Sequence, residues 1–348
     1  MAADGDTDRV DGDLARIDRR LWEPPPEVVE DLAALPGDLL LLGAGGKLGL
    51  TLARMARTAL DAGGSSGRVI AVSRFSEHGR RAEFAAAGVE TLVADATDPA
   101  ALAALPDAAN VVYLVGRKFG THGDEWSTWA INTYLPARVA ERFAGARLVA
   151  FSTGNVYPLT AVGSGGADEL TPPAPVGEYA QSCLGRERLL QHLSIAHATP
   201  VAILRLNYAI DLRYGVLHDV ARAVLAGEPV DVTMGSVNVI WQGDVNAITL
   251  RSLHHAASPP DVLNVTGPET VSVRWLAHEC GRRLGRDPVI VGEEAPTALL
   301  NNASRSMARF GYPRVSLAEM LDWICRWVAA GGPSHGKPTR FEQRVGAF

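Results

Sequence analysis

The sequence predicts an α/β fold built on a doubly wound parallel sheet, and three observations support this prediction. Short apolar runs recur through residues 39–204, as strands of a parallel sheet buried on both faces require. Between these runs, apolar residues fall at the spacing of amphipathic helices. The first run is followed by a glycine-rich turn that opens one of these helices. Strands that alternate with helices in this way form a parallel sheet covered on both faces.

The individual elements can be placed from the same patterns. Residues 1–26 lack periodicity and end in three prolines, so we interpret them as a mobile tail closed by a stiff spacer. Strands are expected at 39–42, 69–72, 91–94, 111–115, 148–151, 201–204 and 262–265. Helices are expected at 27–35, 48–59, 80–87, 126–143, 179–193, 216–226, 275–284 and 317–330. We interpret residues 331–348 as a tail that docks on a neighbouring molecule.

The turn after the first strand has the composition of a diphosphate site. Glycines without Cβ atoms let the backbone approach a diphosphate, and free N–H groups with the helix dipole favour its charge. The alternative is an ordinary glycine-rich connection between a strand and a helix. Because a strand precedes the turn and a helix follows it, we predict cofactor binding by Gly43, Gly45, Gly46, Lys47, Leu48 and Gly49.

The end of the second strand bears on which dinucleotide is bound. Ser73 and Arg74 stand there. In dinucleotide-binding folds an acidic residue at this place accepts hydrogen bonds from the adenosine ribose, whereas an arginine suits a 2′-phosphate. The pair therefore favours NADP over NAD. The alternative is that Arg74 is only a solvated strand end.

Composition excludes several classes of function. The net charge of −6 argues against a nucleic-acid surface, and no apolar run reaches the roughly 20 residues of a membrane span. Three widely spaced cysteines suit neither a disulfide framework nor a metal site, so a reducing cytoplasm is the expected location. Only three of the 33 basic residues are lysines: Lys47, Lys118 and Lys337. The first two lie in loops near the predicted cofactor site.

Several blocks, taken in order, resemble the extended short-chain dehydrogenase/reductases, the NAD-dependent epimerase/dehydratase family. The blocks are residues 43–49, 93–98, 151–158, 177–183, 204–207 and 244–245. The resemblance implies a Rossmann-type dinucleotide domain at 37–206, with core strands returning around 239–265. It also implies a small C-terminal substrate lobe, mainly at 207–330, after an N-terminal extension at 1–36 and before a tail at 331–348.

The same resemblance implies roles for individual residues. Asp95, followed by Ala96, would contact the adenine, and Val115 and Gly116 would border the nicotinamide. Thr153 would bond the substrate oxygen. Tyr179, on the helix that carries the family's catalytic tyrosine, would donate or accept the proton.

One departure from the family pattern bears directly on catalysis. The family places a lysine four residues after the tyrosine, on the same helical face, and Cys183 stands there instead. A thiol supplies no charge to lower the phenol pKa. With a pKa near ~10, about one phenol in a thousand is ionised at pH 7, a cost of roughly 4 kcal/mol.

Three interpretations remain open. Lys118, in the loop beside the nicotinamide, supplies the missing charge, unless it is merely a surface lysine. Alternatively, the protein binds a dinucleotide without turnover and acts as a sensor or assembly partner. In the third, Tyr179 works slowly or only as an acid, in a reaction that depends mainly on positioning.

Other departures narrow the substrate. Dehydratases of the family carry an acidic pair where this chain has Gly154 and Asn155, so sugar dehydration is not expected. Val237 stands where nucleotide-sugar enzymes often carry a diphosphate-binding arginine. We therefore expect an oxidoreductase or epimerase that acts on a free sugar, polyol or sugar acid. The resemblance to the family also implies a homodimer formed through helices 129–143 and 179–193.

Overall fold

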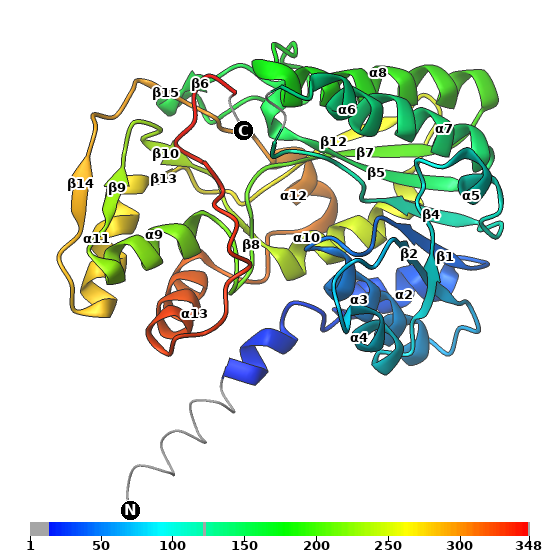
Figure 1. Cartoon of the computed structure of the whole chain (residues 1–348), viewed down its shortest axis with the longest axis horizontal. Coiled ribbons are helices and arrows are strands. Elements are labelled where there is room, and N and C mark those ends of the chain that lie inside the picture. Colours follow the sequence, from blue (N-terminus) through cyan, green and yellow to red (C-terminus); the bar gives the residue numbers. More distant parts are fainter. Residues whose placement is uncertain (1–13, 121–122, 347–348) are drawn as a thin grey trace, which may run out of the picture.

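The computed structural model describes residues 14–120 and 123–346. Its main element is a seven-stranded sheet in the order β12-β7-β5-β4-β1-β2-β3, in which all neighbouring strands are parallel (Figure 1). The predicted doubly wound fold is confirmed. The strands of this sheet are β1 (Leu39–Leu42), β2 (Val69–Ser73), β3 (Glu90–Val93), β4 (Asn110–Tyr113), β5 (Arg147–Thr153), β7 (Val201–Leu206) and β12 (Asp261–Val265).

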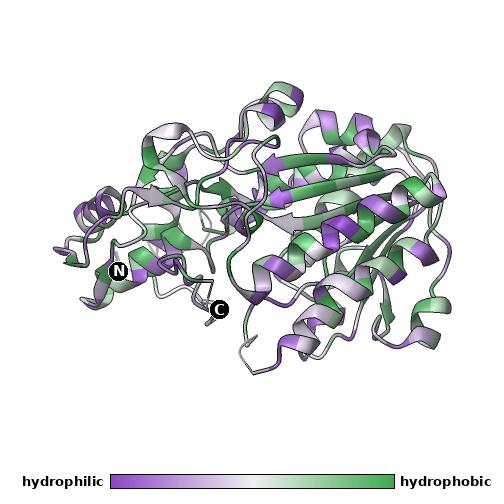
Figure 2. Ribbon diagram, turned by 90° about the horizontal axis from the view of Figure 1, so that it is seen from above, coloured by the Kyte–Doolittle hydropathy of each residue, from purple (hydrophilic) through white to green (hydrophobic). Residues whose placement is uncertain are grey.

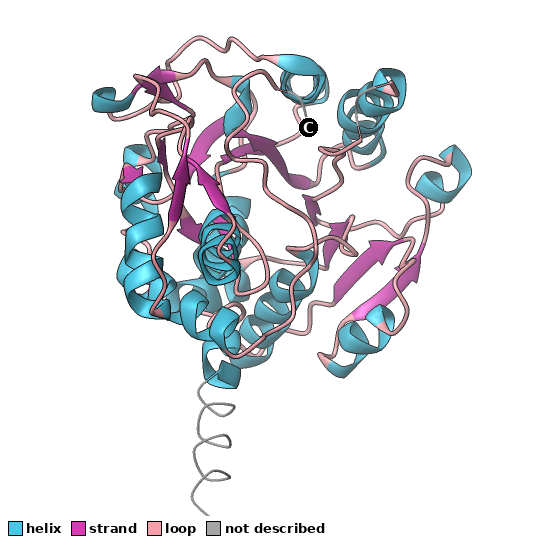
Figure 3. Cartoon of the chain, turned by 60° about the vertical axis from the view of Figure 1, so that its left-hand side comes forward, coloured by secondary structure: helices cyan, strands magenta, loops and turns pink. Residues whose placement is uncertain are grey.

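Helices cover both faces of the sheet (Figures 1 and 3). One layer contains α2 (Pro26–Ala34), α3 (Gly49–Ala62) and α10 (Gln242–Arg251). The other contains α5 (Pro99–Ala103), α6 (Glu125–Trp129), the π-helical turn η1 (Ala130–Tyr134), α7 (Leu135–Arg142) and α8 (Gly177–His197).

The leucine run of β1 shows why this strand needs no polar alternation. Leu39 and Leu41 face the layer of α2 and α3, whereas Leu40 and Leu42 face the layer of α7 and α8. Both sets are buried, so an apolar side chain is required at every position of the strand. Figure 2 shows the same contrast, with mostly hydrophobic strands between helices of mixed hydropathy.

The order of the strands places the functional edge of the sheet. From β1 the chain continues to β2 and β3 on one side, and it then crosses to β4 and β5 on the other side. Ligands of open α/β sheets bind at the carboxyl ends of the strands where the order reverses in this way. The turn after β1 lies at that point.

Beyond β7 a smaller lobe forms around a second hydrophobic core. It is built mainly from α9 (Val216–Ala226), α11 (Val273–Leu284) and α13 (Leu317–Ala329).

The remaining elements of the chain are short: α4 (Arg80–Ala86), α12 (Ser304–Phe310), β6 (Thr160–Ala161), β8 (Ala209–Ile210), β9 (Pro229–Asp231), β10 (Ser236–Val237), β11 (Ile240–Trp241), β13 (Val271–Ser272), β14 (Val289–Val291), β15 (Thr297–Ala298) and the 3₁₀ turns η2 (Gly154–Val156), η3 (Val162–Ser164) and η4 (Ser252–His255).

The prediction of a mobile N-terminal tail is wrong for the part of it that the structure describes. Residues 14–19 are helical, and Leu14, Ile17 and Leu21 are buried in the core of the smaller lobe. Asp18 also forms an ion pair with Arg213, with a distance of 2.7 Å between the carboxylate and the guanidinium. Residues 1–13 lie outside the described part of the chain.

The C-terminal segment, residues 333–346, packs on its own chain rather than projecting from it as a tail. In Figure 1 it runs in red from the end of α13 between the two parts of the molecule toward β6. The main-chain N–H of His335 donates to the oxygen of Arg213 at 3.1 Å. At the far end, Arg344 donates to the main-chain and hydroxyl oxygens of Thr297, both at 2.6 Å. Between these ends, Lys118 in the loop after β4 donates to the main-chain oxygen of Thr339 at 3.1 Å, so the segment contacts both the lobe and a loop at the sheet edge.

In the part of the chain that the structure describes, no helix combines the length and the apolar character needed to cross a membrane.

Candidate functional site

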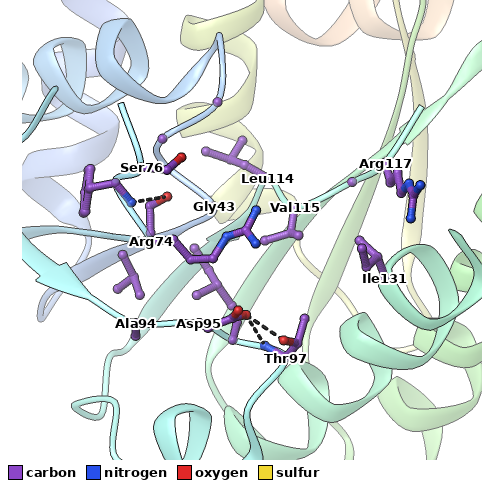
Figure 4. A pocket seen from close by; sticks show the side chains of 18 of the residues that line it. Gly43, Arg74, Ser76, Ala94, Asp95, Thr97, Leu114, Val115, Arg117 and Ile131 are labelled. Atoms are coloured by element: carbon purple, nitrogen blue, oxygen red, sulfur yellow. Dashed lines mark hydrogen bonds between the residues drawn. The ribbon is translucent and has the colours of Figure 1, made fainter. Parts of the chain in front are cut away.

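A pocket of about 800 Å³ opens at the carboxyl ends of β1 to β4, which is the volume of a typical cofactor site (Figure 4). Most of the residues predicted to bind the cofactor line it: Gly43, Gly45, Gly46, Ser73, Arg74, Asp95, Ala96, Val115 and Gly116. Lys47, Leu48 and Gly49 do not line it. Leu48 packs against the core, and Gly49 begins α3.

The turn after β1 leaves no room for a side chain at Gly43, Gly45 or Gly49. Gly43 has a φ of 90°, a left-handed conformation that favours glycine. A Cβ atom at Gly45 would lie 2.5 Å from the hydroxyl of Ser73, and one at Gly49 would lie 1.9 Å from the main-chain oxygen of Ala44. The bare turn and the start of α3 thus form a cradle that fits the diphosphate of a dinucleotide.

The outer end of the pocket carries polar groups from the ends of β2 and β3. The Asp95 carboxylate accepts hydrogen bonds from the hydroxyl of Thr97 at 2.7 Å and from its N–H at 3.0 Å. These bonds hold the pKa of Asp95 below its usual range. The Arg74 side chain reaches across the pocket above Asp95 toward Val115 (Figure 4).

Three residues predicted to act in catalysis, Thr153, Tyr179 and Cys183, lie together, and none of them is among the residues that line the pocket. The side chains of Thr153 and Cys183 both form a hydrogen bond with the Tyr179 phenol. Burial raises the pKa of this phenol well above its usual value, Cys183 adds to the rise, and Arg186 opposes it. Burial also raises the pKa of the Cys183 thiol. Both groups are therefore protonated at neutral pH.

Arg186 is a functional candidate that the sequence reasoning missed. Its side chain is only 5% exposed, and its guanidinium donates to the main-chain oxygens of Asn132 at 2.9 Å and Phe151 at 2.5 Å. No ion pair with a carboxylate is found for it among the described residues. A Cβ atom at Gly116 would lie 3.4 Å from its Nη2 atom, so Arg186 lies directly behind the pocket wall.

A helical pattern was the signal that could have identified Arg186. It follows Tyr179 by seven residues and Cys183 by three, so all three share one face of α8. The physical cost of burying an arginine without a counter-ion marks it as a residue with a specific role.

Lys118 is bonded to the C-terminal segment. Its Nζ atom donates to the main-chain oxygen of Thr339 at 3.1 Å. Burial lowers the pKa of Lys118 to about 8, and the carboxylates of Glu342 and Asp219 oppose this shift. Its charge also acts on Cys183. Arg186 thus acts on Tyr179 and Cys183, whereas Lys118 acts on Cys183.

Asn132 fixes the loop that carries Lys118. It lies in η1, and π-helical turns of this kind are often found at functional sites. Its amide accepts from the N–H of Arg117 at 2.8 Å and donates to the oxygen of the same residue at 2.8 Å. It also donates to the hydroxyl of Ser182 at 3.0 Å, which ties the loop to α8.

A buried ion pair holds the strand ends behind Thr153. Arg205 on β7 and Glu187 on α8 are 5% and 0% exposed and lie 2.6 Å apart. Glu187 also accepts from the Ser152 hydroxyl at 2.6 Å, and Arg205 donates to the Tyr157 hydroxyl at 2.6 Å. This network fixes the backbone on both sides of Thr153.

The structure gives a steric reason for the glycine that follows Thr153. A Cβ atom at Gly154 would lie 2.5 Å from the amide oxygen of Asn301. Asn301 is buried, and within the described chain neither polar atom of its side chain has a hydrogen-bond partner. The space that an acidic side chain would need at position 154 is therefore filled. Val237 is likewise fully buried and packs in the core of the lobe.

No group of three or more histidine, cysteine or carboxylate side chains that could hold a metal ion is present in the described ranges.

Solved structures with the same fold include several sugar-nucleotide epimerases. UDP-glucuronic acid 4-epimerase from Bacillus cereus in complex with NAD has a TM-score of 0.70 and 19% identity, over 84% of this chain and 99% of that chain. UDP-glucose 4-epimerase from Thermotoga maritima with UDP-glucose has a TM-score of 0.68 and 16% identity, with the same coverage. For the UDP-glucose 4-epimerase of Thermus thermophilus in complex with NAD, the values are 0.67 and 20%, over 83% and 97%.

At these identities the likeness to solved structures shows the fold alone, and no match was found among curated proteins. A family model identifies the family as well as the fold. The model described as "NAD dependent epimerase/dehydratase family" matches residues 39–265, from β1 to the end of β12. This range contains the glycine turn, the pocket strands and the cluster around Tyr179. The chain therefore belongs to the NAD-dependent epimerase/dehydratase family.

Proposed function

We propose that the protein is an NAD(P)-binding oxidoreductase or epimerase that acts on a hydroxyl or carbonyl group of a sugar, polyol or sugar acid. One observation carries the proposal: Thr153 and Tyr179 meet beside a buried guanidinium, behind the pocket wall at Gly116. A proton donor and a fixed cation at this place can stabilise charge on a reacting oxygen.

The roles of the chain's residues follow from their positions. The bound dinucleotide supplies hydride chemistry. The Thr153 hydroxyl donates a hydrogen bond to the substrate oxygen and orients it. Tyr179 donates its proton to that oxygen as the carbonyl becomes an alcohol, and it takes a proton back in the reverse direction. Because burial raises the pKa of Tyr179, the phenol is the resting form and suits the reductive direction.

Arg186 would supply the charge that a lysine at position 183 provides in the family pattern. Its guanidinium opposes the rise in the phenol pKa, so it favours the tyrosinate that forms when the proton leaves. Lys118 remains the second cation proposed for this role, because its charge also reaches Cys183. The two cations are held by different parts of the chain. Arg186 is fixed by main-chain oxygens of η1 and β5, and Lys118 by the C-terminal segment.

We propose NADP as the preferred cofactor. The second strand ends in Ser73 rather than an acidic residue, and Arg74 crosses the outer end of the pocket (Figure 4). Arg80 lines the same end. Two guanidinium groups there favour a 2′-phosphate over a free ribose hydroxyl.

The activity test compares turnover across substrates and cofactors. Purified protein is incubated with NADP or NAD and a panel of free sugars, polyols and sugar acids, with UDP-glucose and UDP-glucuronic acid included because the solved epimerases bind them. Reduction is followed by absorbance and epimerisation by nuclear magnetic resonance. Turnover that is abolished by Tyr179→Phe supports the proposal. Dinucleotide binding without turnover of any substrate contradicts it.

A second candidate function is a dinucleotide-binding sensor or assembly partner without turnover. The observation that favours it is the neutral thiol of Cys183, which burial keeps protonated beside the tyrosine. In that case Cys183→Lys would create no activity, and Tyr179→Phe would leave the dinucleotide affinity of the protein unchanged.

We also propose a homodimer formed through α6, η1, α7 and α8. Large apolar side chains are exposed along these helices, with Trp126 at 70%, Tyr134 at 61% and Ile195 at 63%. Sedimentation of the wild-type protein should give a dimer, and charged substitutions at these three positions should give a monomer.

A further inference from the structure

The C-terminal segment contributes a cation to the dinucleotide pocket. Lys337 lines the pocket, and every other described residue of its lining comes from residues 42–135. Lys337 is therefore separated by about 200 residues of sequence from the rest of the lining, and it reaches the pocket only because the segment folds back over the sheet edge.

The segment is held in this position by specific contacts on the C-terminal side of Lys337. The carboxylate of Asp219 on α9 accepts from the N–H of Thr339 at 2.8 Å and from its hydroxyl at 2.6 Å. Lys118 donates to the oxygen of the same residue. Thr339 is only 2% exposed and Phe341 only 7%. The placement of Lys337 is thus set by buried anchors two and four residues away.

The three lysines of the chain converge at this junction. Lys47 follows Gly46 in the glycine turn, Lys118 is bonded to the segment, and Lys337 is part of it. Lys118 and Lys337 both act on the charge of Lys47, and together with burial they lower its pKa to about 7. The carboxylate of Asp219, which opposes this shift, also accepts the two hydrogen bonds from Thr339. Cations gathered beside a turn of main-chain N–H groups favour an anionic ligand.

We propose that the C-terminal segment is part of the dinucleotide site: Lys337 binds the pyrophosphate of the cofactor, and the segment closes over it. The proposal rests on the dinucleotide binding of the proposed function. It adds a ligand-contacting residue from outside residues 39–265, the range that the family model matches.

The test measures dinucleotide binding to the full-length protein by calorimetry and the rate of cofactor release by stopped-flow fluorescence. Lys337→Gln should weaken NAD and NADP about tenfold each and should speed release by a similar factor, since it removes one charged contact to phosphate. Lys337→Arg should restore most of the affinity. Arg340→Gln is the matched control, because it removes the same charge from an exposed position of the same segment outside the pocket.

The outcomes separate this proposal from the proposed function. If Lys337→Gln binds and releases both dinucleotides as Arg340→Gln does, the segment is not part of the site and this inference is overturned. A loss confined to NADP overturns the assignment to the pyrophosphate, because the lysine would then contact the 2′-phosphate. If wild-type protein binds neither dinucleotide, the proposed function itself fails.

Discussion

The Nε atom of Arg186 donates to the main-chain oxygen of Asn132 at 2.9 Å, and this bond joins the helix of the tyrosine to the π-helical turn. Pro136, four residues after Asn132, has no N–H, so this oxygen lacks the donor that an α-helix normally supplies. A buried cation is thereby fixed at a distance of one helical turn from Cys183. The arrangement gives the site a charge without a lysine.

Arg186→Met should lower turnover about 100-fold, because the charge that favours the tyrosinate is lost. Arg186→Lys should retain part of the activity. The readout that separates catalysis from folding is the double variant Cys183→Lys/Arg186→Met, in which the lysine restores a cation and should recover turnover. If the double variant is as inactive as Arg186→Met while both remain folded by circular dichroism, Arg186 acts through structure rather than charge.

Cys183→Lys in the otherwise wild-type chain should raise turnover about tenfold, because a nearby ammonium lowers the phenol pKa. The pH profile provides the check. Since burial holds the pKa of Tyr179 above its usual value, reduction by the wild-type protein should not decline between pH 7 and 9. In Cys183→Lys, the decline in the rate of reduction should begin at lower pH than in the wild-type protein. A drop in activity at every pH would show that the site depends on the thiol.

Dinucleotide affinity should fall as pH rises from 6 to 9. Burial, Lys118 and Lys337 lower the pKa of Lys47 to about 7, while Asp219 and Asp211 oppose the shift. A bound diphosphate favours the charged amine, so its pKa rises on binding and protons are taken up above pH 7. Calorimetry in two buffers of different ionisation enthalpy measures this uptake. In Lys47→Met the pH dependence should be largely lost, and a persistent dependence would assign it to another group.

Arg74→Gln should weaken NADP about tenfold and leave NAD nearly unchanged, because only NADP offers a 2′-phosphate to the guanidinium. Equilibrium titration with both nucleotides measures the ratio. Arg81→Gln, which removes the same charge from an exposed position outside the pocket, is the matched control. Equal affinities of wild-type protein for the two nucleotides would contradict the NADP preference.

Glu187→Gln should destabilise the protein by about 3 kcal/mol, because Arg205 would be left buried without its counter-ion. Denaturant unfolding measures the change. Glu83→Gln, which removes the carboxylate of a more exposed pair with Arg80, should cost less than about 1 kcal/mol. Similar losses in the two variants would mean that the buried pair has no special weight.

How much of the molecule the sequence predicts depends on how local the signal is. The leucines of β1 and the glycines after it specify a buried strand and a tight turn through their own chemistry, so both were predicted correctly as structure. The helix at 14–19 was missed although Leu14, Ile17 and Leu21 follow helical spacing, because the surface that buries them lies in the distant lobe.

The catalytic surroundings were harder to predict for the same reason. Tyr179 and Thr153 were expected together from their motifs. That Arg186 is buried depends on the carbonyls of β5 and η1, which no local pattern reveals. The position of Lys337 depends on the bonds of Thr339 to Asp219, across 120 residues of sequence.

The fold-back of the chain end has a consequence for the kind of reaction the site can complete. A coenzyme that can leave only after the C-terminal segment has moved away would remain bound through successive catalytic cycles. The electron pair removed from a carbon of the substrate would then have no other acceptor and would return to the molecule that gave it. Such a protein would invert a stereocentre with no net consumption of coenzyme. The C-terminal segment would then favour isomerisation over net oxidation or reduction.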